Sequence, residues 1–113
     1  MDGDIKKDNE VNILFDFYQS LLTSKQQQYV ELYYADDLSL GEISEQANVS
    51  RQAVYDNLKR TVNSLYSYEN HLHLYDHFKK RTKLVDQMHD QVSKKYPNDV
   101  DLLAVINQLS ELE

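Results

Sequence analysis

The segment from Ser39 to Arg60 reads SLGEISEQANVSRQAVYDNLKR and carries the signals of two short helices joined by a tight turn. Ser39 and Glu42 have the spacing of a capping box, in which the hydroxyl accepts from the third helical N–H and the carboxylate reaches back. Asn48 tolerates the left-handed conformation that such a turn requires, and Ser50 is a suitable N-cap for the second helix. The local chemistry therefore predicts a helix, a turn and a second helix.

Apolar and small residues fill the positions at which two crossing helices would pack. The first helix needs an apolar residue beside a small one, an apolar plug follows the turn, and inward positions recur on the second helix. These positions are held by Ile43, Ser44, Ala47, Val49, Val54 and Leu58. The pattern predicts a helix-turn-helix, and the alternative left open is a motif that serves packing alone.

The outward residues of the second helix are chemically suited to nucleic acid. Arginine matches guanine and glutamine matches adenine by paired hydrogen bonds, and basic residues one or two turns further on suit phosphates. If this helix enters a major groove, the predicted contacts are Arg51, Gln52, Tyr55, Lys59 and Arg60. Asp56 would oppose phosphate unless it pairs with Arg60 four residues on.

The rest of the chain has helical periodicity, with apolar residues at steps of three and four. Only 2 glycines and 1 proline occur in 113 residues, which disfavours the many tight turns of an all-β fold. We therefore predict an all-α helical bundle with long C-terminal helices. Residues 1–113 are expected to form one domain, with a helix-turn-helix core at 23–66 and a C-terminal extension at 67–113.

One helical run lacks a clear stop signal. Neither glycine nor proline occurs from Ser50 to Tyr96, and an unbroken helix of that length would span about 70 Å. A break between Ser67 and His71 is expected because globular helices are usually much shorter, but no residue there requires it.

The distribution of charge bears on the expected partners. The formal net charge is −7, which disfavours tight non-specific binding to nucleic acid. Seven basic residues nevertheless lie between residues 51 and 83 against three acidic ones, a local net charge of +4. Any nucleic-acid contact is therefore expected in the middle third of the chain. No signal peptide or membrane-spanning stretch is evident, so we expect a cytoplasmic protein without membrane insertion.

Three stretches resemble the YlxM family of small bacterial proteins. They are FDFYQSLLT (Phe15 to Thr23), LYYADDLSLGEI (Leu32 to Ile43) and VSRQAVYDNLKRT (Val49 to Thr61), with weaker similarity through LYDHFKKRTKL to the C-terminus. The helix-turn-helix part is similar to domain 4 of bacterial sigma factors, which reads promoter DNA. Members of the YlxM family are encoded beside components of the signal recognition particle. The resemblance therefore implies an accessory or regulatory role in that targeting pathway, with particle components as partners.

Catalysis and metal binding have little support. The absence of cysteine excludes thiolate chemistry, and the two glycines are isolated, so no phosphate-cradling loop exists. His73 and His77 lie four residues apart with His71 nearby, but no convincing third metal ligand accompanies them. We predict a non-enzymatic protein with no cofactor and no metal.

The C-terminal half has more aromatic and apolar residues than one packed helix requires. Residues predicted to meet a partner or a second copy are Tyr75, Phe78, Val85 and Met88. Three alternatives stay open for this segment: a homodimer, a docked partner protein, or packing back onto the helices of residues 8–35. In the alternative function, these helices modulate a targeting GTPase or its RNA, and the helix-turn-helix is only a scaffold.

Overall fold

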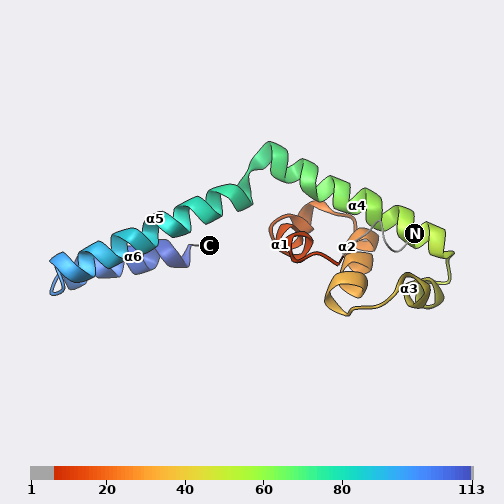
Figure 1. Cartoon of the computed structure of the whole chain (residues 1–113), viewed down its shortest axis with the longest axis horizontal. Coiled ribbons are helices and arrows are strands. Elements are labelled where there is room, and N and C mark those ends of the chain that lie inside the picture. The colour runs from red at the N-terminus through yellow and green to blue at the C-terminus, as the bar shows by residue number, and fades with distance from the viewer. Residues whose placement is uncertain (1–6, 113) are drawn as a thin grey trace. The chain divides into compact units, whose positions relative to one another are not determined.

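The computed structural model describes residues 7–112, in which every regular element is helical (Figure 1). The predicted all-α class is confirmed. The chain divides into two compact units, one ending at His73 and the other beginning at Leu74. The predicted boundary between the helix-turn-helix core (23–66) and the C-terminal extension (67–113) falls inside a continuous helix that spans residues 51–72. That division of the domain stays a prediction.

The first unit opens with helices that are capped by short polar side chains. Helix α1 (Asn9–Tyr18) is capped by Asp8 and is followed by a 3₁₀ turn, η2 (Gln19–Leu21). Helix α2 (Ser24–Val30) begins with a capping box between Thr23 and Gln26, and it continues into a π-helical turn, η3 (Glu31–Ala35). The caps satisfy N–H groups that would otherwise lack partners at a helix start.

Helices α3 (Leu40–Ala47) and α4 (Arg51–Leu72) complete this unit. Helix α4 packs against α1, α2 and α3, so one long helix organises the whole core (Figure 1). The fully buried side chains include Leu14, Tyr18, Val30, Leu40, Ile43, Val54, Leu58, Thr61 and Leu65. The Tyr18 hydroxyl donates to Glu69 Oε1 at 2.6 Å, which gives its polar end a partner.

The long helical run breaks at His73, which lies just beyond the interval expected from the sequence. His73 has a left-handed backbone (φ 57°), and its N–H closes α4 by donating to the Glu69 carbonyl. Glycine is the usual residue for this conformation, and histidine accepts it at a cost of roughly 1 kcal/mol. A break made by histidine leaves no glycine or proline signal in the sequence.

The second unit is a helical hairpin. Helix α5 (Leu74–Lys95) is followed by a turn containing Pro97, and α6 (Val100–Glu111) returns beside it with Asp99 as its N-cap (Figure 1). Its core consists of Val85, Val92 and Ile106, with Leu103 and Leu109 packed against them. Within residues 7–112, no helix combines the length and apolar character needed to cross a membrane.

Candidate nucleic-acid interface

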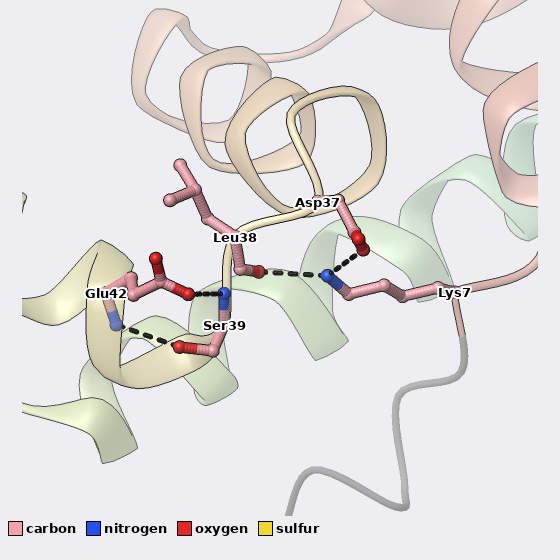
Figure 2. A network of polar contacts seen from close by, with 5 residues as sticks. All are labelled: Lys7, Asp37, Leu38, Ser39 and Glu42. Carbon is pink, nitrogen blue, oxygen red and sulfur yellow. Dashed lines mark hydrogen bonds and ion pairs between the residues drawn. The ribbon is translucent and has the colours of Figure 1, made fainter.

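The start of α3 is fixed by reciprocal hydrogen bonds. The Glu42 N–H donates to Ser39 Oγ and the Ser39 N–H donates to Glu42 Oε1, both at 3.1 Å (Figure 2). Two residues of the preceding loop accept hydrogen bonds from Lys7 Nζ: Asp37 through Oδ1 at 2.7 Å and Leu38 through its carbonyl at 3.1 Å (Figure 2). The predicted capping box is therefore present, and Lys7 binds the loop that leads into the motif.

The turn between α3 and α4 has the geometry that the sequence predicts. Asn48 is left-handed (φ 55°, ψ 46°), and the Val49 N–H donates to the Ser44 carbonyl at 3.1 Å. Ser50 Oγ then accepts from the Ala53 N–H at 3.0 Å and caps α4. These contacts set the direction in which the N-terminal turn of α4 leaves the motif.

Two predicted base-reading residues lie at this N-terminal end of α4. Arg51 and Gln52 are both exposed. The Arg51 side chain lies beside Gly41 of α3, where a Cβ added to the glycine would be 3.6 Å from Arg51 Nε. A methyl group at position 41 would touch the arginine at an ordinary van der Waals distance, so the position of Arg51 does not depend on the glycine.

Gln52 and Asp56 form a hydrogen-bonded pair on the first two turns of α4. Gln52 Nε2 donates to Asp56 Oδ1 at 2.9 Å. The pairing of Asp56 with Arg60 that would offset this carboxylate is not formed in the described part of the chain. Spacing alone could not choose between these partners, because Gln52 and Arg60 each lie four residues from Asp56.

Tyr55 lies in a different environment from the outward one expected. Its side chain is only 7% exposed and packs into the core. Its hydroxyl accepts from Lys59 Nζ at 3.4 Å, and the ammonium lies 5.6 Å from the centre of the ring. Tyr55 therefore contacts Lys59 through both its hydroxyl and its ring. The predicted role of Tyr55 in nucleic-acid binding stays a prediction.

Lys59 and Arg60 lie further along α4, and both are exposed. With Asp56 and Asn63 they line a shallow hollow of about 220 Å³. Asn63 was not predicted as a site residue, and only its spacing from Lys59 and Arg60 could have indicated it. Two cations with a neighbouring amide are suited to phosphate oxygens.

The four residues predicted for a partner interface differ in their exposure to solvent. Tyr75 and Phe78 are half-buried, and Val85 is buried in the core between α5 and α6. Met88 is exposed on α5. Lys79 Nζ lies 4.4 Å from the centre of the Tyr75 ring, a cation–π distance. Val85 thus holds the hairpin together, which a spacing argument on one helix could not reveal.

Two of the histidines, His71 and His73, have structural positions at the end of α4. His71 Nδ1 lies 2.7 Å from the Ser67 carbonyl one turn earlier in α4, and His73 closes that helix. In residues 7–112, no group of three or more histidine, aspartate or glutamate side chains is placed to hold a metal ion.

The fold and the α3–turn–α4 geometry define the class: this is a helix-turn-helix protein. The chain belongs to the UPF0122 family, described as "Putative helix-turn-helix protein, YlxM / p13 like". The family model matches residues 5–103. The resemblance seen in the sequence is thereby confirmed.

Relatives of nearly the same length share about half of the residues. A UPF0122 protein of Pediococcus pentosaceus is 52% identical over 110 residues, covering 97% of each chain. One of Anoxybacillus flavithermus is 50% identical over 109 residues, covering 96% of this chain and 99% of the relative. One of Lactococcus lactis subsp. cremoris is 48% identical over 110 residues, covering 97% and 96%.

Proposed function

We propose that this protein is a non-enzymatic regulatory protein that binds nucleic acid through the N-terminal half of α4. The observation that carries the proposal is the exposure of Arg51 and Gln52 on the first turn of a helix that follows a left-handed turn and a serine cap. In helix-turn-helix proteins, this end of the second helix lies in the major groove.

The side chains of α4 have separable roles in this proposal. Arg51 is positioned to read a guanine edge, and Gln52 an adenine edge once it exchanges its bond with Asp56. Lys59 and Arg60 neutralise phosphates and fix the register of the helix on the duplex. Tyr55 holds Lys59 in place through its hydroxyl and ring.

The charge of the chain sets the expected strength of binding. A net charge of −7 opposes a polyanion, and only the middle of the chain is basic. We therefore expect modest affinity that falls steeply with salt, or recruitment by a partner.

The partner is proposed from family resemblance. Because the YlxM resemblance implies work beside the signal recognition particle, we place the nucleic-acid contact in that targeting pathway. A second candidate is an interaction module that acts through Tyr75 and Phe78 on a targeting GTPase or its RNA. The Gln52–Asp56 bond favours it, because a carboxylate beside a base-reading residue weakens that surface for DNA.

A salt titration tests the first proposal. Affinity for duplex DNA and for structured RNA is measured from low to physiological salt, for the wild type and for the double variant Lys59→Ala, Arg60→Ala. Loss of two phosphate contacts should flatten the log–log slope by roughly 2. The control is Lys94→Ala, Lys95→Ala, which removes the same charge from the end of α5 and should leave the slope unchanged.

Two results would contradict the proposal. One is no binding by the wild type even at low salt. The other is an equal loss of slope in both double variants, which would show that overall charge matters and α4 does not. The second candidate predicts instead a salt-tolerant complex with the targeting particle that fails when Tyr75 and Phe78 are changed to alanine.

A further inference from the structure

The α5–α6 hairpin leaves most of its large apolar side chains in solvent. Its buried core holds only Val85, Val92 and Ile106. Leu74, Tyr96 and Val100 are exposed near the helix ends. Five further large apolar side chains, four on the two helices and the last at the C-cap of α6, are exposed: Leu84 (64%), Met88 (39%), Leu102 (38%), Val105 (59%) and Leu112 (78%). In the other unit, Leu21 and Leu72 are the comparable exposed side chains among the described residues.

These five residues lie on one side of the hairpin, which we call the α5–α6 face. Leu84 and Val105 each precede an inner residue, Val85 or Ile106, by one position. In two antiparallel helices, a step of one residue in the same chain direction turns both side chains toward the same side of the pair. Met88 lies one turn from Leu84, and Leu102 and Leu112 recur at steps of three and seven from Val105.

A hairpin with so small a core is marginal by itself. Units of about 40 residues rarely bury enough apolar surface to offset their conformational entropy without further support. A row of exposed leucine, valine and methionine side chains is the usual mark of an interface. The α5–α6 face is therefore expected to be covered in solution.

The charges of the two helices indicate what covers it. Helix α5 has six basic and three acidic residues, a net charge of +3, whereas α6 has two acidic residues and no basic one. A second hairpin placed face to face, with each α5 beside the α6 of the other copy, sets opposite charges against each other on both sides. The face is thus complementary to itself under a two-fold rotation.

We propose that the α5–α6 face binds a second copy of this chain, so that two hairpins form an antiparallel four-helix bundle. Leu84 and Met88 of one copy pack against Leu102, Val105 and Leu112 of the other, in the way that apolar stripes fill the core of such bundles. The dimer carries two helix-turn-helix motifs, although its formation does not depend on nucleic-acid binding.

Sedimentation equilibrium of the full chain tests this proposal. The wild type should change from the monomer mass of 13.3 kDa to twice that mass over roughly a hundredfold range of concentration. Val105→Glu, and separately Leu84→Glu, should weaken association at least about tenfold, because each buries a charge at the centre of the interface. Val100→Glu is the matched control, since Val100 is exposed on the opposite side of α6 and should leave the dimer intact.

Thermal unfolding provides a second measurement if a variant folds poorly. The midpoint of the wild type should rise with protein concentration, and that of Val105→Glu should not. A wild type that stays monomeric with a constant midpoint would overturn the proposal and leave the face to another protein. A dimer that survives both face variants as well as it survives Val100→Glu would also overturn it.

Discussion

Three non-glycine residues in the described part of the chain hold left-handed backbone angles: Asp37, Asn48 and His73. Each follows a helical element, namely η3, α3 and α4. The conformation is strained for a residue with a Cβ, and asparagine and aspartate tolerate it best because their short polar side chains bond locally. In a chain with two glycines, Asn48 closes α3 and His73 closes α4.

Asn48 gives a direct measure of this strain. Asn48→Ala should lower the free energy of unfolding by about 1 kcal/mol, because alanine disfavours the left-handed conformation. Asn48→Gly should leave stability equal or slightly higher, because glycine adopts the angle freely. Urea unfolding followed by circular dichroism measures both. Equal loss in the two variants would show that the side chain, and not the backbone angle, is what the turn requires.

Because the Tyr34 phenol is partly buried, we expect the folded protein to lose stability at high pH. Burial raises the pKa of its phenol above the ordinary value of 10.0, with Tyr33 and Tyr66 adding to the effect. A raised folded-state pKa means that the folded state keeps the proton longer than the unfolded chain. The contribution of the Tyr34 phenol to the free energy of unfolding is complete below pH 10.0 and is lost as the pH rises above that value. Tyr66 shifts in the same direction, through burial and its hydrogen bond to Glu10.

The measurement is the urea midpoint from about pH 8 to about pH 11. The wild type should lose stability above pH 10.0, and Tyr34→Phe should lose less over the same range. Tyr96→Phe is the control, because Tyr96 is exposed on the other unit. If the Tyr34 and Tyr96 variants follow the wild-type curve alike, burial of Tyr34 does not cause the loss.

At the scale of the element, α4 combines a core face with a candidate binding face. Val54, Leu58, Thr61 and Leu65 are fully buried and organise the first unit. Arg51, Gln52, Lys59 and Arg60 are exposed on the same helix. Asp56 lies among these exposed residues, and its carboxylate is the one unfavourable charge on the proposed surface.

Asp56→Asn should strengthen nucleic-acid binding about fivefold at low salt. The change removes one charge near phosphate, which is worth about 1 kcal/mol at contact distance in water, and the asparagine carbonyl can still accept from Gln52. Fluorescence anisotropy with duplex DNA and structured RNA measures it. Asp16→Asn, at an exposed position of α1, makes the same change of net charge and should have a smaller effect. Unchanged or weaker binding by Asp56→Asn would place the ligand elsewhere.

Local chemistry predicted the motif well, because its signals are contained within a few residues. The Ser39–Glu42 box, the Asn48 turn and the Ser50 cap each depend on neighbours in sequence. Tyr55 and Val85 were placed less well, because their burial depends on which other helices pack against them. The break at His73 also left no local signal, since histidine adopts the left-handed angle only at a cost.

At the scale of the whole molecule, the two units have cores of very different size. The first unit buries side chains from α1, α2, α3 and α4, whereas the second has three buried residues. Stability is therefore expected to be unequal along the chain, with α5 and α6 opening more readily than α4.

Ile106→Ala tests this separation. The truncation leaves a cavity in the core of the hairpin and should cost about 3 kcal/mol there, so that amides of α5 and α6 exchange much faster. Amides in the middle of α4 should keep their protection. Leu58→Ala is the converse control, because it should weaken the first unit. Loss of protection throughout the chain in both variants would show that the two units unfold as one.

The π-helical turn η3 has a consequence for changes in chain length. The Asp36 N–H donates to the Glu31 carbonyl five residues back, so this turn holds one residue more than an α-helical turn would. Deleting a single residue between Glu31 and Ala35 would convert the π turn into an α turn, and the residues that follow would keep roughly their direction because the wider turn already absorbs the extra residue. The same deletion from the regular part of α2 would rotate the capping loop, α3 and the motif by about 100°. Single-residue deletions should therefore be tolerated better in η3 than in α2, although η3 looks like an ordinary stretch of helix.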